Sequence, residues 1–237
     1  MGLQDVKPGA KYTNARGRVV FFNFIDFPYF NDKRHGAEMD TKNVEETFEM
    51  LGYSVKCHEN FSSKQMESEL NAIVSDQSLW YLDSLIIIIG THGTERTKFY
   101  TSDSRGNTLD ITWVRKFFSN KNCPSMKNKP KILIGNFCRG KFYESDALVY
   151  QIKQKLSHMI TLFSCTEDTV SLRNTSSGSC FITTLCNTLK NNQEEELSVI
   201  MNITAKDLED QKKHCPHPTS YVEHPFCKFV FKCQGSE

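Results

Sequence analysis

The sequence lacks the features that mark membrane, secreted and nucleic-acid-binding proteins. None of its apolar runs approaches the roughly 20 residues that a membrane-spanning helix needs. Residues 1–18 contain no apolar stretch typical of a secretory signal, and Val6 stands where a myristoylation motif has serine or threonine. The 29 basic residues are balanced by 28 acidic ones, so no positive surplus indicates nucleic acid. We therefore expect a cytoplasmic protein with neither a membrane nor a nucleic-acid partner.

Cysteine, in contrast, is abundant, with nine residues in the chain. Because nothing indicates export, we expect most of them to be buried thiols rather than disulfides. No two cysteines form a C-x-x-C pair, which argues against zinc. One zinc site stays open as an alternative, near the C-terminus, from His214, Cys215, His217, Cys227 and Cys233. Our expectation is that the protein needs no metal and no cofactor.

Apolar strands alternate with amphipathic segments along the chain, which predicts an α/β domain with a mostly parallel sheet. Residues 1–16 are polar and are predicted to be a short disordered leader. The expected strands are residues 18–27, 53–57, 84–90, 131–135, 159–165 and 226–232. The expected helices begin at Asp40 or Thr41, at Ser62 or Ser63, and near Ile111, Phe181 and Glu195.

Two of these strands are followed by residues that carry chemistry. The run Ser84 to Gly90 leads to His92, and the run Lys131 to Gly135 leads to Cys138. Side chains at the carboxyl ends of strands line the crevice of an open α/β sheet. A nearby histidine lowers the pKa of a cysteine or accepts its proton, which activates the thiol as a nucleophile. The alternatives are an inert buried cysteine and a histidine that only ends a strand.

The residues around this pair resemble those of the caspases. That family carries Q-A-C-[RQG]-G with a histidine about 50 residues upstream. Here residues 136–140 read Asn-Phe-Cys-Arg-Gly, and His92 precedes Cys138 by 46 positions. The resemblance runs from about Arg18 to about Lys232. It implies a three-layer sandwich around a six-stranded sheet, and a cysteine endopeptidase that cleaves proteins after aspartate in apoptosis-type signalling.

Two further motifs resemble the parts of that family that grip the substrate aspartate. One is Arg34-x-Gly36 followed by Asp40 and Asn43, and the other is residues 171–174, Ser-Leu-Arg-Asn. Two guanidinium forks match a carboxylate and select an acid strongly, although a single loop arginine is usually just solvated. The resemblance implies substrate binding by Arg34, Asn136, Ser171, Leu172, Arg173 and Asn174, and catalysis by His92, Cys138 and Gly93. Backbone N–H groups of Gly93 and Cys138 would hold the oxyanion, and no third triad carboxylate is evident.

The sequence departs from the family pattern at three places. Asn136 replaces the family's glutamine, Phe137 replaces a small alanine, which is a tolerable change, and only 35 positions separate Cys138 from Arg173. Asn136 and the short linker favour a second interpretation, a weak or inactive homologue that heterodimerises with an active caspase and regulates it. A third interpretation is a thiol hydrolase of another specificity, which would not depend on Arg34 and Arg173.

Residues 143–146, Tyr-Glu-Ser-Asp before Ala147, resemble the self-cleavage sites of the family. We expect a zymogen cut at Asp146, with Asp5 as a weaker site for removal of the leader. The expected parts are residues 1–16, a large-subunit part 17–146 and a small-subunit part 147–237. The short leader implies a downstream member that other proteases activate. The implied partners are a second copy or a related caspase, joined through the C-terminal strand, and inhibitor-of-apoptosis-type proteins.

Overall fold

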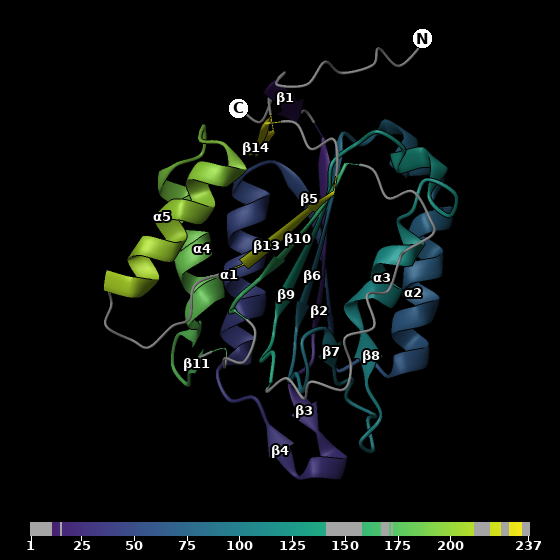
Figure 1. Cartoon of the computed structure of the whole chain (residues 1–237), viewed down its shortest axis with the longest axis vertical. Helices are drawn as coiled ribbons and strands as arrows, with labels where there is room; N and C mark the ends of the chain where they lie inside the picture. The colour runs from purple at the N-terminus through teal and green to yellow at the C-terminus, as the bar shows by residue number, and fades with distance from the viewer. Residues whose placement is uncertain are drawn as a thin grey trace.

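The computed structural model describes residues 11–14, 16–140, 158–166, 171, 173–210, 219–223 and 228–233. A six-stranded sheet lies between two layers of helices (Figure 1). Five of its strands are parallel, and β13 at one edge is antiparallel to its neighbour β10, so the predicted three-layer α/β sandwich is confirmed. In order across the sheet, the strands are β13 (Thr219–Glu223), β10 (Met159–Phe163), β9 (Lys131–Asn136), β6 (Ser84–Gly90), β2 (Gly17–Asn23) and β5 (Tyr53–Glu59).

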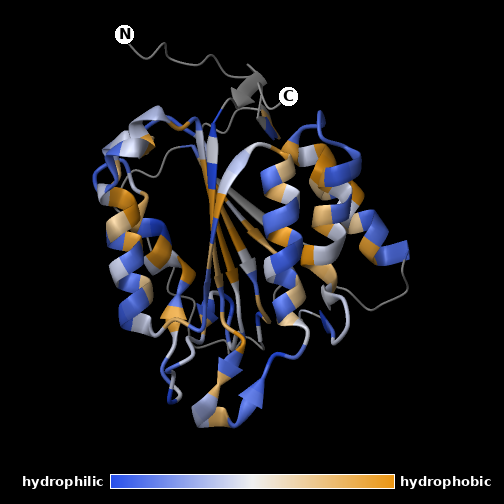
Figure 2. Ribbon diagram, turned by 180° about the vertical axis from the view of Figure 1, so that it is seen from behind, coloured by the Kyte–Doolittle hydropathy of each residue, from blue (hydrophilic) through white to orange (hydrophobic). Residues whose placement is uncertain are grey.

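The two central strands, β6 and β9, are buried along their whole length, as their unbroken apolar runs predict. Successive side chains enter opposite cores because a strand alternates its faces. Ile86 and Ile88 belong to one core and Ile87 and Ile89 to the other. Figure 2 shows these strands as the most hydrophobic part of the molecule, with hydrophilic helix faces outside.

Five α-helices of the described part of the chain cover the sheet. The helices α2 and α3 lie on one face, and α1, α4 and α5 on the other (Figure 1). The predicted start of α2 is confirmed, because the side chains and backbone N–H groups of Ser62 and Gln65 form a reciprocal capping box. The bounds are α1 (Ala37–Met50), α2 (Ser63–Ser75), α3 (Ile111–Phe117), α4 (Cys180–Asn191) and α5 (Leu197–Asp210).

The predicted start of α1 is wrong. The helix begins at Ala37 after Gly36, so Asp40 lies inside its first turn rather than at its cap. The carboxylate of Asp40 instead accepts a hydrogen bond from the backbone N–H of Ser179, which is 139 positions further along the chain. A cap residue and a buried residue with a distant partner look the same in the sequence.

The predicted strand 18–27 is too long, because β2 ends at Asn23. The chain leaves the sheet at Phe24 and forms a hairpin from β3 (Asp26–Phe27), the 3₁₀ turn η1 (Pro28–Phe30) and β4 (Asp32–Lys33). The remaining short elements are η2 (Gln77–Tyr81), β7 (Lys98–Phe99), β8 (Leu109–Asp110), η3 (Pro124–Met126), β11 (Arg173–Asn174) and β12 (Gly178–Ser179).

The C-terminal strands also differ from the prediction. The sixth strand of the sheet is β13, which the neighbouring prolines at 216 and 218 made look like a broken pattern. The predicted last strand becomes β14 (Lys228–Cys233), which pairs with β1 (Lys11–Asn14) in a separate two-stranded sheet. Residues 11–14 of the predicted disordered leader are therefore ordered in a strand.

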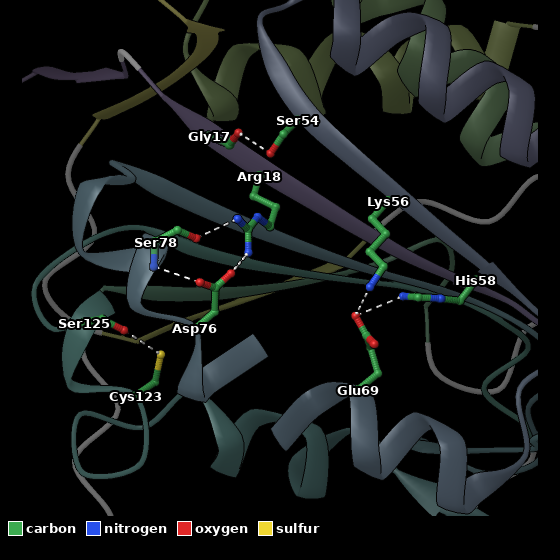
Figure 3. A network of polar contacts seen from close by, with 10 residues as sticks. All are labelled: Gly17, Arg18, Ser54, Lys56, His58, Glu69, Asp76, Ser78, Cys123 and Ser125. Carbon is green, nitrogen blue, oxygen red and sulfur yellow. Dashed lines mark hydrogen bonds and ion pairs between the residues drawn. The ribbon is translucent and has the colours of Figure 1, made fainter. Parts of the chain in front are cut away.

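Charged side chains join β2 and the edge strand β5 to α2 and the turn that follows it (Figure 3). Arg18 Nη1 lies 2.6 Å from Asp76 Oδ2, and its Nη2 donates to Ser78 Oγ at 2.9 Å. Glu69 Oε1 lies 2.7 Å from Lys56 Nζ and 3.2 Å from His58 Nε2. We refer to these residues as the α2-facing network: Arg18, Lys56, His58, Glu69, Asp76 and Ser78.

Candidate active site

The register of β6 and β9 brings His92 and Cys138 to one edge of the sheet. Gly90 pairs with Asn136, and the N–H of Thr91 donates to the carbonyl of Asn136 at 3.2 Å. His92 and Cys138 each lie two residues beyond this last pair, at the carboxyl ends of adjacent parallel strands. Neighbouring strands are what the two buried runs predict.

Two glycines allow the loops after these strands to pack backbone against backbone. A Cβ atom at Gly93 would collide with the carbonyl oxygen of Cys138, and one at Gly140 with the carbonyl oxygen of Thr94. Gly140 also has a φ of 44°, which favours glycine. Larger residues here would force the histidine and cysteine loops apart.

The N–H of Gly93 is kept out of the local β pairing. Gly93 forms a bridge opposite Phe99, but its hydrogen bonds come from the neighbouring residues. The N–H of Tyr100 donates to His92, and that of Thr94 donates to Lys98. The pairing therefore leaves the N–H of Gly93 for another acceptor, as a donor to an oxyanion requires.

His92 is partly buried and lies between an aromatic ring and a carboxylate. The centroids of its ring and the Phe27 ring are 4.9 Å apart, and its Nε2 is 3.0 Å from Asp32 Oδ2. Burial lowers the pKa of His92, the positive charges of Arg34 and Arg173 lower it further, and Asp32 opposes them. The imidazole is thus held neutral near pH 7, in the state that can accept a proton.

The structure places beside His92 one carboxylate, that of Asp32, which the sequence analysis did not select. Asp32 lies in β4, only two positions before Arg34, in a loop that the family resemblance covers. This closeness to the Arg34 motif is the feature of the sequence that could have drawn attention to Asp32. The sequence does not show that the β3–β4 hairpin folds back onto the strand of His92.

Arg34 is buried and fixed by neutral acceptors. Its Nη1 donates to Asn23 Oδ1 at 3.1 Å and to the carbonyl of Phe24 at 2.8 Å. Burial and the positive charge of Arg173 lower its pKa to about 9, so it keeps its charge at neutral pH. Arg173, on β11, is partly buried, and its pKa is lowered mainly by burial. Within the described residues, neither guanidinium has a carboxylate at ion-pair distance.

Asp40 is a buried acid whose negative charge raises the pKa of both Arg34 and Arg173. Its Oδ1 accepts from the N–H of Ser179 at 2.7 Å, and its Oδ2 has no hydrogen-bond partner in the described part of the chain. Burial raises the pKa of Asp40 to about 6, although Ser179, Arg34 and Arg173 oppose the rise. The carboxylate links α1 to β12 across the site.

Asn136 ends β9 and is buried. Its Oδ1 accepts hydrogen bonds from Ser171 Oγ and Ser179 Oγ, both at 3.0 Å. Its Nδ2 is buried and has no partner among the described residues. An unused buried donor is costly unless a ligand supplies the acceptor.

Of the other predicted residues, the structure describes Asn174 but not Leu172 or the cleavage sites. Asn174 is exposed, and its Oδ1 accepts from the N–H and Oγ of Ser176. Leu172 and the predicted cleavage sites Asp146 and Asp5 lie outside the described residues.

The described cysteines form no disulfide, and three of the six, Cys123, Cys165 and Cys186, are buried. No group of three or more histidine, cysteine or acidic residues in the described ranges could hold a metal ion. Of the alternative zinc site, His214, Cys215, His217 and Cys227 lie outside those ranges, and the side chain of Cys233 is not described. None of the described helices is long and apolar enough to cross a bilayer.

A three-layer α/β domain with a cysteine and a histidine at adjacent strand ends has the layout of a cysteine peptidase. Residues 16–227 match the family described as Caspase domain, Peptidase_C14. Because this match covers most of the sequence, the chain belongs to the caspase family of cysteine-type peptidases.

Individual relatives agree with this assignment. The chain is 29% identical over 209 residues to caspase-1 of Equus caballus, covering 77% of this chain and 50% of the relative. It is 26% identical over 196 residues to caspase a of Danio rerio, covering 74% and 50%. The chain thus spans about half the length of these relatives. The crystal structure of caspase-1 from Spodoptera frugiperda superposes with a TM-score of 0.82 at 20% identity, covering 100% of this chain and 98% of that one, which shows the shared fold.

Proposed function

We propose that the protein is a cysteine endopeptidase that cleaves proteins after aspartate. The observation that carries this proposal is a set of donors with no carboxylate at ion-pair distance among the described residues. Arg34 and Arg173 each lower the pKa of other positive groups at the site, and Asn136 Nδ2 is buried with no partner in the described part of the chain. A substrate carboxylate bound between the guanidinium groups would offset this repulsion and accept their hydrogen bonds.

In the proposed mechanism, the thiol of Cys138 transfers its proton to His92, and the thiolate attacks the scissile carbonyl carbon. Since Nε2 of His92 faces Asp32, Nδ1 is the nitrogen that receives the proton. The oxyanion is held by the N–H groups of Gly93 and Cys138. The tetrahedral intermediate then collapses to a thioester, and His92 returns the proton to the departing amine. Water, deprotonated by His92, hydrolyses the thioester and restores the thiol.

The test is cleavage of fluorogenic tetrapeptides that end in aspartate, beside the same peptides ending in asparagine. We expect turnover only of the aspartate peptides, and none by Cys138→Ala. Absence of turnover by the wild-type protein, before and after a cut at Asp146, would contradict the proposal. Equal turnover of both peptides would indicate a thiol hydrolase of another specificity.

A second candidate function is regulation of an active relative by a weak or inactive homologue. The observation that favours it is the short amide at the end of β9. Asn136 Oδ1 is already engaged by two serine hydroxyls, so the amide is tied to the protein on one side. In this case Cys138→Ala would change the activity of a partner caspase as much as the wild-type chain does.

We further propose that the chain is a zymogen that matures by a cut at Asp146 into a large part, residues 17–146, and a small part, residues 147–237. Prolonged incubation of concentrated active protein should give a cut whose mass is consistent with Asp146, and Asp146→Ala should remain whole. An uncut wild-type chain with full activity would contradict this proposal. Control by inhibitor-of-apoptosis-type proteins remains a prediction.

For the proposed homodimer, we propose the sheet edge at β13 as the interface in place of the predicted C-terminal strand. The sheet ends at β13, which has a strand neighbour only on the β10 side within the described part of the chain, whereas β14 already pairs with β1. An open edge strand is the part of a sheet that adds another strand. Sedimentation velocity should therefore show a dimer, and a strictly monomeric active protein would contradict it.

A further inference from the structure

The hairpin of β3 and β4 places a carboxylate against the histidine of the site. We propose that Asp32 is a positioning residue that holds the imidazole of His92 and stabilises its protonated form when it takes the proton of Cys138. This inference rests on the proposed roles of Cys138 and His92, and it adds an acidic third member that acts through His92.

The geometry at the ring supports this role. Asp32 Oδ2 lies 3.0 Å from His92 Nε2, the separation of an ion pair. Nε2 is buried. The carboxylate beside it raises the pKa of the ring, and Nδ1 is left for the thiol.

Packing sets the position of the carboxylate. Phe27, before the turn, contacts the His92 ring. Phe30 lies 5.2 Å from the ring of Tyr100, and the N–H of Tyr100 donates to the carbonyl of His92 at 2.9 Å. The hairpin is thus attached to the histidine segment just before its turn and at the last residue of the turn, and Asp32 follows two positions later.

The surrounding charges explain why an acid is needed here. Arg34 and Arg173 both disfavour a positive charge on His92, as does burial of the ring. Proton transfer from Cys138 would create an imidazolium beside two guanidinium groups. Asp32 is the group whose charge opposes all three effects. Its side chain is 52% exposed, so solvent screens part of this interaction.

The first experiment follows the His92 ring directly. NMR titration of the imidazole in Asp32→Asn should show a pKa below that of the wild type, since the stabilising negative charge is lost. Asp26→Asn is the matched control, because Asp26 lies in the same hairpin and contacts Lys33 and Asn60 instead. A His92 pKa that is unchanged in Asp32→Asn, or changed equally in Asp26→Asn, would overturn the proposal.

The second experiment measures catalysis. We expect kcat of Asp32→Asn to fall about 5- to 10-fold with little change in KM, far less than the ~10⁴-fold loss known for a buried triad carboxylate. The limb of the pH–rate profile that reports His92 should move to lower pH, and Asp32→Glu should restore part of both. A profile at the wild-type position would overturn the proposal. An inactive wild-type protein would contradict the proposed function instead, and the titration would still decide the role of Asp32.

Discussion

Charged residues are arranged in opposite ways in the α2-facing network and at the candidate active site. In the network each acid faces a basic partner, as Asp76 faces Arg18 and Glu69 faces Lys56. At the site, the positive charge of Arg173 lowers the pKa of Arg34, and neither arginine has a carboxylate at ion-pair distance in the described residues. Charged side chains thus join secondary-structure elements in the network. At the site, the two arginines have no carboxylate partner at ion-pair distance in the described residues.

The carboxylates report the same contrast. Hydrogen bonds from Arg18 and Ser78 lower the pKa of Asp76 to about 2. Burial raises the pKa of Asp40 to about 6, although two arginines act on it. An ion pair near the surface keeps most of its hydration, whereas a buried acid loses its hydration, which disfavours its charged form. The ionised carboxylate of Asp40 therefore lowers the free energy of unfolding, whereas that of Asp76 raises it.

The largest expected difference between the regions comes from removing one arginine from each. Arg173→Ala should lower kcat/KM for aspartate peptides about 10²- to 10³-fold, because a desolvated carboxylate loses one of its two partners. Arg18→Ala should leave kcat/KM within about twofold. Steady-state kinetics on both variants checks this, and a comparable loss in the two would remove the functional distinction between the regions.

The glycines of the histidine and cysteine loops give the next test. Gly140→Ala should reduce kcat about 10²-fold, since its Cβ would meet the backbone of Thr94 and displace Cys138 from His92. Gly106→Ala is the control, because Gly106 also has a positive φ, 103°, but nothing within 4 Å of the added atom. If both variants lose activity equally, backbone strain rather than loop separation is responsible.

A third test uses the pH dependence of stability at the site. Because its folded-state pKa is raised, Asp40 should cost stability as pH rises from about 4 to 6, by up to about 3 kcal/mol. Asp40→Asn keeps an oxygen for the N–H of Ser179 and should remove this fall. Urea unfolding of both proteins at pH 4.5 and pH 7 measures it. An identical pH slope in the two would contradict the buried, raised pKa.

The smallest effect is expected in the α2-facing network, with the opposite sign. The lowered pKa of Asp76 means that its stabilisation is present above about pH 4 and is lost as pH falls towards 2. Asp76→Asn should cost at most about 1 kcal/mol at pH 7, because the pair is partly exposed. The difference from wild type should vanish near pH 2. Equal destabilisation at pH 7 and pH 2.5 would assign the effect to packing.

The fold could be predicted from the sequence where burial is complete. The run Ser84–Gly90 is apolar on both faces, so its length and its central position follow directly. Prediction failed where pairing depends on distant residues. β13 is a polar strand whose place is set by β10, and the strand at residues 11–14 exists only through its pairing with β14.

The candidate site shows the same division. Cys138, His92, Arg34 and Arg173 stand in motifs with fixed spacing, so they could be selected from the sequence. Asp32 could not, because its contact with His92 depends on how the β3–β4 hairpin folds back. Asp40 was selected as a helix cap and as part of the motif after Arg34, but no local pattern reveals its partner on β12. Local motifs identify the groups, and tertiary contacts decide what acts on them.

The pairing of β9 with β10 has a further consequence. These adjacent parallel strands share five residue pairs, Lys131–Met159 to Gly135–Phe163, yet the cleavage site predicted at residue 146 lies between them in sequence. If the proposed cut at residue 146 takes place, the backbone hydrogen bonds of the sheet, the α1–α4 packing and the bond from Ser179 to Asp40 would still join the two fragments. The cut would then give two chains that remain one folded body.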